Sequence, residues 1–246
     1  MVKLTGERKA VSSALLALYG FLFLIVCMQP PPGWEKVFIG LTLIYWVGFF
    51  GVVAGYFWGR WYALGLGLSG LASAGISIFQ MGPEPVLVFY GVTHGLISIA
   101  LWGNQMAKTF DGKLEWRKRF HLDEQATDKL GKAITRLGMS LPYVIMYALA
   151  PKNGSALAGI AGFAGLGLAG LGFFGFLKHR TWSLAALVGG AVMTYGSVLV
   201  YSPTLTLSDA NTLSSAGVLA SGLLATSLLV AATQPYWKSV VRALKA

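Results

Sequence analysis

The chain has 246 residues, of which 55% are hydrophobic and only 11% are charged, and its formal net charge is +10. Soluble proteins carry roughly 25% charged residues, so this composition excludes an ordinary soluble domain. Cys27 is the only cysteine, which excludes an internal disulfide and a thiolate metal cluster.

Eight apolar stretches follow one another along the chain, and each is long enough to cross a bilayer. About 20 residues, at a rise of about 1.5 Å each, span a hydrocarbon core of about 30 Å. The stretches lack the alternating pattern of membrane-barrel strands. We therefore predict an all-α integral membrane protein, a polytopic bundle of eight transmembrane helices at 10–29, 37–58, 61–81, 85–104, 133–150, 154–177, 182–201 and 211–233.

The basic residues are distributed unevenly between the two sides of this predicted bundle. Seventeen of the 19 Lys and Arg residues fall on the side of the N-terminus, and only Lys36 and Lys152 fall on the other side. Positively charged loops stay on the cytoplasmic side, so we predict a plasma (inner) membrane protein with both termini cytoplasmic. The positive charge then reflects membrane insertion and contact with anionic lipids, not binding to nucleic acid.

One connection, residues 105–132, is long and rich in charge. Leu122, Ala126 and Leu130 recur every four residues in it, which predicts a short amphipathic helix on the membrane surface. A docking site for a partner is the alternative interpretation of this segment. The connection divides a single transmembrane domain, 1–246, into two halves, 10–104 and 133–233.

Both halves carry a similar motif between their second and third helices. The first half reads FFGVVAGYFWGRW at 49–61, and the second reads FFGFLKHRTW at 173–182. The shared order of FFG, Arg and Trp favours a parallel 4+4 repeat of the kind found in some transporters. The alternative is that glycine-rich membrane hairpins resemble one another without a duplication.

Glycines recur at helical spacing in two of the predicted helices. Gly51, Gly55 and Gly59 follow one another every four residues on the second helix, and Gly162 and Gly165 lie among small residues of the sixth. Small side chains let helix backbones approach closely in lipid, so we predict that these five glycines pack helices together. The sixth helix has small side chains on several of its sides, so we expect it to lie centrally in the bundle or at an interface between subunits.

The third and fourth predicted helices meet at the turn GPEP, residues 82–85, and both carry polar residues at helical spacing. His94 lies about 14 Å beyond Pro85, near the membrane midplane, and a similar distance back along the third helix reaches Ser73. We predict a polar seam between the two helices, with a neutral His94 hydrogen-bonded to Ser73 or Ser77. The seam comprises Ser69, Ser73, Ser77, Gln80, Tyr90, His94 and Ser98.

An ionisable side chain at membrane depth is costly and suggests a function by default, so three roles for His94 stay open. They are a structural interhelical hydrogen bond, a place on a ligand or ion path, and axial ligation of a haem or pigment. All nine acidic residues fall in loops or at helix ends, and no metal-ligand set or placed acid and base is present in the sequence. These patterns disfavour an enzyme and an ion-coupled transporter.

The leading functional prediction is a non-catalytic integral membrane subunit that packs within, or docks onto, a larger membrane assembly. Its partners would be other membrane protein subunits or copies of itself, within the lipid bilayer. The alternative is an uncoupled carrier or channel for a small neutral or apolar solute, which would use the polar seam. A third interpretation is a haem- or pigment-binding protein with His94 as the single axial ligand; no other cofactor is predicted.

Overall fold

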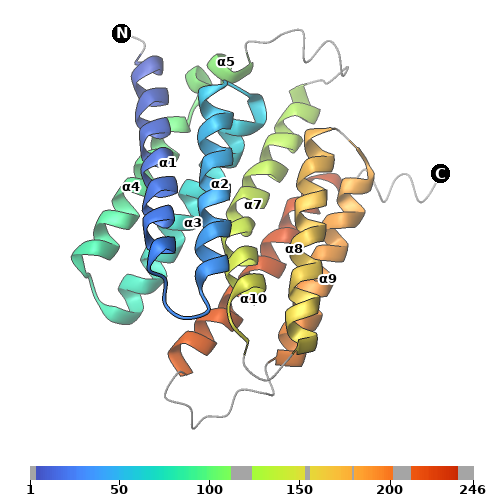
Figure 1. Ribbon diagram of the computed structural model, residues 1–246. Helices are drawn as coiled ribbons and strands as arrows, with labels where there is room; N and C mark the ends of the chain where they lie inside the picture. The colour runs from blue at the N-terminus through green and yellow to red at the C-terminus, as the bar shows by residue number, and fades with distance from the viewer. Residues whose placement is uncertain (1–3, 112–123, 153–155, 179, 202–211, 238–246) are drawn as a thin grey trace, which may run out of the picture. The chain divides into compact units, whose positions relative to one another are not determined.

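A computed structural model describes residues 4–111, 124–152, 156–178, 180–201 and 212–237 of the chain. Every regular element in these residues is a helix, which confirms the predicted all-α class (Figure 1). The α-helices are α1 (Thr5–Met28), α2 (Glu35–Val53), α3 (Phe57–Met81), α4 (Pro85–Leu101), α5 (Asn104–Asp111), α7 (Glu124–Leu149), α8 (Ala156–Leu177), α9 (Trp182–Tyr201) and α10 (Thr212–Thr233). A 3-10 turn, η2 (Gln234–Tyr236), follows α10.

Six helices of the described chain are long and apolar enough to cross a membrane, which supports a multi-pass membrane protein. They are α1, α2, α3, α8, α9 and the segment Gly217–Tyr236. The other two predicted spans differ for physical reasons. α4 has only 17 residues, and α7 begins with a charged segment that includes Asp128 and Lys132. The predicted count of eight therefore depends on α4 and α7.

Glycines with a left-handed backbone lie just after three of the helices. Gly55 follows the end of α2 with a φ of 71°, and Gly82 and Gly103 follow α3 and α4 with φ of 90° and 101°. A side chain with a Cβ atom rarely adopts this conformation, so glycine lets the chain turn sharply there. The predicted stripe of Gly51, Gly55 and Gly59 on one helix is wrong, because α2 stops before Gly55 and Gly59 lies in α3.

Only the two ends of the segment 105–132, within which a surface helix was predicted, belong to the described residues. α5 occupies the start of this connection, and Glu124 begins α7, which continues into the fifth predicted span. Leu130 is buried, so packing within the protein covers it. Leu122 and the Ala126 side chain lie outside the described residues, so the predicted face can be followed only at Leu130.

The chain divides into two compact units. Unit 1 consists of Met1–Ile25 and Thr42–Met139, and unit 2 consists of Val26–Leu41 and Ser140–Ala246. Unit 1 therefore contains α3, α4 and α5 with parts of α1, α2 and α7, and unit 2 contains α8, α9 and α10.

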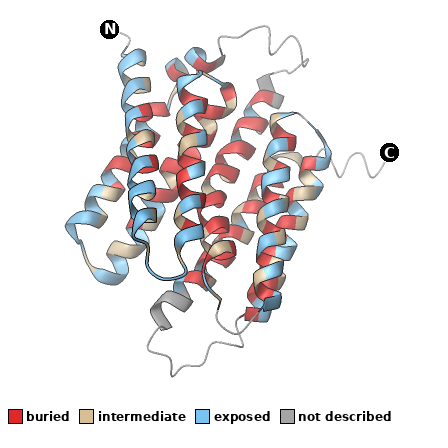
Figure 2. Ribbon diagram, viewed as in Figure 1, coloured by how far each residue is buried: buried red, intermediate tan, exposed pale blue. Residues whose placement is uncertain are grey.

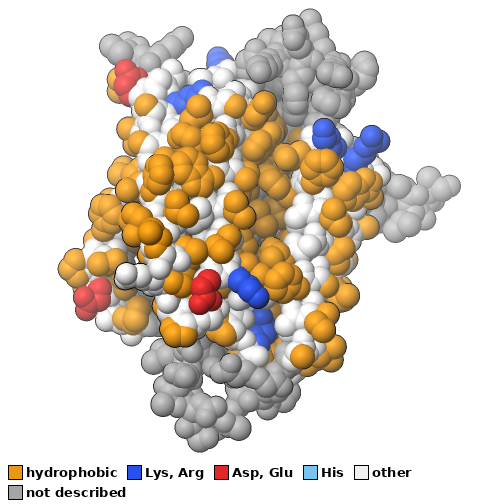
Figure 3. Space-filling model, viewed as in Figure 1, with side chains coloured by type: hydrophobic (Ala, Val, Ile, Leu, Met, Phe, Trp, Pro, Cys, Tyr) orange, Lys and Arg blue, Asp and Glu red, His pale blue; other side chains and the backbone are white. Residues whose placement is uncertain are grey.

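Each unit has its own buried core, and burial differs strongly between helices (Figure 2). α1 is largely exposed, whereas α7 is largely buried. The large, fully buried side chains of unit 1 include Leu16, Tyr45, Tyr62, Leu66, Ile97 and Leu101, and those of unit 2 include Tyr147, Leu187 and Leu229. Hydrophobic side chains also cover much of the visible helix surface, with charged side chains near helix ends (Figure 3). This distribution is the one expected of helices that face lipid.

Candidate functional site

The α3–α4 hairpin of unit 1 packs closely at two glycines of α3. A Cβ atom added to Gly67 would lie 2.5 Å from Ser98 Oγ, and one added to Gly70 would lie 2.0 Å from His94 Cδ2. Both distances are far shorter than van der Waals contact, so only a glycine fits at either position. The imidazole of His94 therefore lies directly against the α3 backbone, and its exposed fraction is 0%.

Both ring nitrogens of His94 have hydrogen-bond partners. Nδ1 lies 2.8 Å from the carbonyl oxygen of Tyr90, one turn earlier in α4. Because a carbonyl oxygen only accepts, Nδ1 carries the hydrogen and donates it. Nε2 lies 2.6 Å from the hydroxyl of Tyr45 in α2. In the neutral imidazole, whose single N–H hydrogen then lies on Nδ1, Nε2 accepts the hydroxyl hydrogen of Tyr45.

Three tyrosine rings surround the imidazole. The ring centroids of Tyr19 and Tyr90 each lie 4.1 Å from that of His94. The ring of Tyr45 lies 5.8 Å away in an edge-to-face arrangement, which aromatic pairs favour. The Tyr19 hydroxyl also hydrogen-bonds to the hydroxyl of Thr93, the residue next to His94. Side chains of α1, α2 and α4 thus meet in one group beside the α3 backbone at Gly70. We call this group the His94 cluster; it consists of Tyr19, Tyr45, Tyr90, Thr93 and His94.

The residues of the predicted polar seam occupy different environments in this unit. Ser69 is buried and donates to a backbone carbonyl of its own helix, and Ser98 is buried with no hydrogen-bond partner among the described residues. The predicted bond from His94 to Ser73 or Ser77 is wrong, because both nitrogens of His94 are bonded elsewhere. The half-buried and exposed members of the seam are Ser73, Ser77, Tyr90 and Gln80.

Sequence reasoning missed Tyr19 and Tyr45, which supply two of the three aromatic neighbours of His94. Each lies well inside a long apolar helix, as His94 does, so a tyrosine at mid-depth was the available signal. The pairing also depends on which helices are neighbours and how each is rotated. The apolar runs carry no such information, because they are hydrophobic on every side.

Two arginines bind the C-terminal end of α4. Arg8 comes from α1 and is half-buried, and Arg60 comes from α3 and is buried. The last carbonyls of a helix lack partners within it and carry the negative end of its dipole, so guanidinium groups stabilise them. Together the two side chains donate to five consecutive carbonyl oxygens, those of Ile99, Ala100, Leu101, Trp102 and Gly103.

The glycines predicted to pack helices make contacts within each unit. In unit 1, Gly51 and Gly59 face each other, since a Cβ atom on Gly59 would lie 2.3 Å from the carbonyl carbon of Gly51. In unit 2, a Cβ atom on Gly165 of α8 would lie 2.4 Å from Thr194 Oγ1 of α9. Gly162 is less tightly enclosed, with its nearest neighbour at 3.4 Å.

The geometry of the His94 cluster favours an interhelical structural role. Axial ligation of a metal needs a ring nitrogen with a lone pair, and here only Nε2 has one. A haem or pigment would therefore have to displace the Tyr45 hydroxyl. A path for a solute through the same point would also have to move the imidazole away from Gly70.

Comparisons with known proteins assign no further property to the site. The chain matches no model of a protein family, and no curated protein or solved structure is detectably similar to it. The functional argument therefore depends on the residues and contacts described above.

Proposed function

We propose that the protein is a non-catalytic integral membrane subunit that packs against a transmembrane helix of another subunit or of a second copy. In this proposal the chain crosses the plasma membrane eight times, with α4 and α7 as the additional crossings and both termini cytoplasmic. The distribution of charge supports this topology, because 17 of the 19 basic residues fall on one predicted side.

The observation that carries the proposal is that α8 presents glycines on two faces. On one face, Gly165 lies against α9. On the other, Gly167 and Gly170 are exposed, and a Cβ atom added to either would have no neighbour within 4 Å in the part of the chain that the structure describes. Large exposed apolar side chains border these two glycines on the same helix: Ile160, Phe163, Leu171 and Phe174.

Glycines on an open helix face have a cost that lipid contact does not offset. A glycine inside a helix destabilises it by roughly 0.5–1 kcal/mol relative to alanine. Against another helix in lipid, however, it allows close backbone approach and stronger dispersion contacts. Gly167 and Gly170 form a shallow notch between large side chains, and the ridge of a partner helix fits such a notch.

The native mass of the protein, extracted from its own membrane in mild detergent, tests the proposal. We expect a complex larger than the 26.2 kDa chain. Gly167→Leu should release the chain from this complex without lowering its melting temperature, because an added Cβ atom would meet none of the described residues within 4 Å. Gly75→Leu is the matched control, since Gly75 of α3 is also open.

Two results would contradict the proposal. One is a wild-type protein that is monomeric under these conditions. The other is a Gly167→Leu variant that keeps the wild-type native mass. If Gly75→Leu and Gly167→Leu both release the chain, the loss reflects a general effect of leucine on the lipid-facing surface, and α8 is not the specific interface.

The carrier and haem alternatives have weaker support. Both need the hydrogen bond between Tyr45 and His94 to open, at a point where the imidazole is fully buried. A visible absorption spectrum of the purified protein separates the haem or pigment alternative from the other two, because only a bound haem or pigment would absorb visible light.

A further inference from the structure

A pocket of about 480 Å³ lies along the second half of α4 in unit 1. Its volume falls within the range of roughly 300–1,000 Å³ that small-molecule sites occupy. We propose that this pocket binds a neutral, membrane-soluble carbonyl compound whose carbonyl oxygen accepts a hydrogen bond from Ser98. The inference is independent of the proposed interface on α8, which belongs to unit 2.

Most of the residues that line this pocket are apolar. They include Leu68 and Leu71 of α3, and Gly95 and Ile99 of α4. Leu71 is 43% exposed and Ile99 is 69% exposed, so the pocket opens through the apolar outer surface of the two helices. In the proposed topology α4 crosses the membrane, and this opening then faces lipid. A molecule that enters the pocket would therefore come from the bilayer.

Gly95 leaves room for a ligand between α3 and α4. A Cβ atom added to Gly95 would have Leu71 Cδ1 as its nearest neighbour among the described residues, at the ordinary contact distance of 3.8 Å. At Gly67 and Gly70 of the same hairpin, by contrast, an added Cβ atom would overlap the side chains of α4. The two helices are thus in close contact at Gly67 and Gly70 and leave space at Gly95.

Ser98 brings a polar group without a partner to the wall of this pocket. The residue is only 6% exposed, and its hydroxyl has no hydrogen-bond partner among the described residues. The hydroxyls of Ser69 and Thr93, by contrast, each donate to a carbonyl oxygen of their own helix. A buried hydroxyl without a partner is costly, and a bound ligand is one way to satisfy it. The Ser98 hydroxyl lies against Gly67, and rotation about a single bond turns it toward the pocket.

Arg8 supplies a second hydrogen-bond donor to the wall of the pocket. Its Nε and Nη2 atoms donate to the carbonyl oxygens of Ile99, Ala100 and Trp102, which leaves the two N–H groups of Nη1 as further donors. The positive charge of Arg8 lies against the negative end of the α4 dipole, so the pocket does not need an anion to balance it. A carbonyl oxygen accepts hydrogen bonds and donates none, so it is the neutral group that two donors favour.

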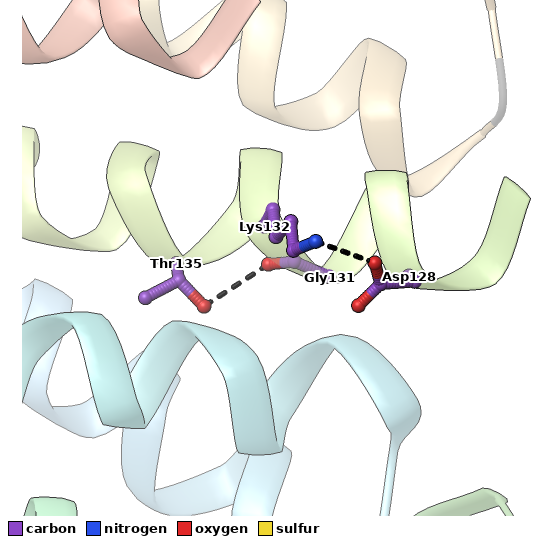
Figure 4. A network of polar contacts seen from close by, with 4 residues as sticks. All are labelled: Asp128, Gly131, Lys132 and Thr135. Atoms are coloured by element: carbon purple, nitrogen blue, oxygen red, sulfur yellow. Dashed lines mark hydrogen bonds and ion pairs between the residues drawn. The ribbon is translucent and has the colours of Figure 1, made fainter. Parts of the chain in front are cut away.

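A second pocket, of about 450 Å³, adjoins the first but differs in its polar groups. On its α7 wall, Lys132 pairs with Asp128 at 2.6 Å (Figure 4). Thr135 of the same wall donates to the carbonyl oxygen of Gly131 at 3.0 Å. These polar groups have partners within their own helix, whereas the Ser98 hydroxyl has none in the part of the chain that the structure describes. The proposed ligand therefore belongs to the pocket beside Ser98.

Equilibrium binding of tritiated decylubiquinone to the full-length protein in nanodiscs tests the proposal. This probe carries carbonyl oxygens on an apolar ring with one alkyl chain, and empty nanodiscs measure its partition into lipid. We expect saturable binding, and decylbenzene, which has the same alkyl chain but no carbonyl group, should compete poorly. Ser98→Ala should weaken binding about fivefold, because it removes one hydrogen bond worth about 1 kcal/mol. Gly95→Leu should abolish binding, because the new side chain fills the pocket.

Two control variants lie outside the pocket and should bind the probe as the wild type does. Gly75→Leu adds the same side chain to α3 at a position where an added Cβ atom would meet none of the described residues within 4 Å. Lys132→Gln removes a basic residue that lines only the adjoining pocket. Melting curves show whether each variant is folded, and Ser98→Ala keeps the test decisive if Gly95→Leu is not.

Four results would overturn the proposal. Equal competition by decylbenzene would mean that the pocket does not recognise a carbonyl group. Unchanged binding by Ser98→Ala, or equal losses in Gly95→Leu and Gly75→Leu, would remove the assigned site. Loss of binding in Lys132→Gln together with normal binding in Gly95→Leu would move the ligand to the adjoining pocket. Stronger competition by dodecanoate than by unlabelled decylubiquinone would show that the pocket selects an anion.

Discussion

The hydroxyl of Tyr45 lies 2.6 Å from Nε2 of His94, and this hydrogen bond joins α2 to α4 inside unit 1. The other ring nitrogen donates to the carbonyl oxygen of Tyr90, so the imidazole is satisfied on both sides. A buried polar group that finds all its partners stabilises one arrangement of helices over others. The histidine at mid-depth in α4 is therefore explained by packing among four helices, without a substrate or cofactor.

Substitutions at this pair should separate loss of a hydrogen bond from loss of a side chain. Tyr45→Phe leaves Nε2 without a donor and should lower the free energy of unfolding by about 1 kcal/mol. His94→Leu should cost a similar amount, because it removes the imidazole nitrogen that accepts from the Tyr45 hydroxyl. His94→Gln should be nearly silent, since its amide oxygen can accept from Tyr45. Thermal unfolding in mild detergent measures all three, and equal losses for the Gln and Leu variants would argue against the hydrogen bond.

The arginine at the start of α1 should stabilise a helix that lies far away in the sequence. Arg8→Gln removes bonds to three carbonyl oxygens at the end of α4, and we expect a loss of about 1–2 kcal/mol. Lys9→Gln is the neighbouring control. It removes one exposed hydrogen bond to the Val53 carbonyl and a contact of the ammonium group with the Phe110 ring at 5.7 Å, and should cost less than about 1 kcal/mol, as is usual for exposed charged contacts. A larger effect of Lys9→Gln would contradict this account of the α4 terminus.

The close contact between α8 and α9 should not accommodate a larger side chain. Gly165→Leu places atoms against Thr194 and the α9 backbone, and overpacking of this kind costs about 1–3 kcal/mol. Gly159→Leu on the same helix is the control, because a Cβ atom added there would have no neighbour within 4 Å among the described residues, and the melting temperature should stay unchanged. An unchanged melting temperature for Gly165→Leu would mean that this face of α8 does not pack against α9.

Lys152 should make stability depend on pH in the alkaline range. Its ammonium group donates to the carbonyl oxygens of Tyr147 and Ala148, and burial lowers its pKa from 10.5 to about 8. Between these values the unfolded chain binds more protons than the folded one, so stability should rise as the pH increases from 8 to 10.5. Lys152→Met should reduce this slope relative to wild type in melting curves recorded at several pH values. An identical slope in the variant would assign the dependence to other groups.

The sequence predicted the helices well, because length and hydropathy identify segments that lie in lipid. The predicted range 182–201 coincides with α9, and most other ends differ by a few residues. The largest difference lies at the start of α7, which begins at Glu124 and not at the predicted 133. At the end of α2 the apolar run continues through Gly55, but the backbone turns left-handed at that residue. A hydropathy pattern cannot separate a glycine inside a helix from one that ends it.

The site was predicted only in part, and for a different reason. Depth could be counted from the turn at Pro85, so His94 was expected near the midplane and buried. The hydrogen-bond partner of His94 could not be predicted in this way. It is Tyr45, a residue of α2, and α2 does not adjoin α4 in the sequence. Arg8 and Arg60 show the same limit. Their charges predicted a side of the membrane, and their bonds to α4 required the tertiary structure.

The membrane topology of α4 and α7 is the central claim of the account, because the eight-helix topology depends on whether these two helices cross. Single cysteines at Glu84, Thr109 and Pro151 in a Cys27→Ser background, labelled with a membrane-impermeant reagent in sealed vesicles, test it directly. The account predicts that the cysteines at 84 and 151 label from outside and the one at 109 labels only from the cytoplasmic side. Labelling of all three positions from one side would mean that neither α4 nor α7 crosses, and would contradict the eight-helix topology.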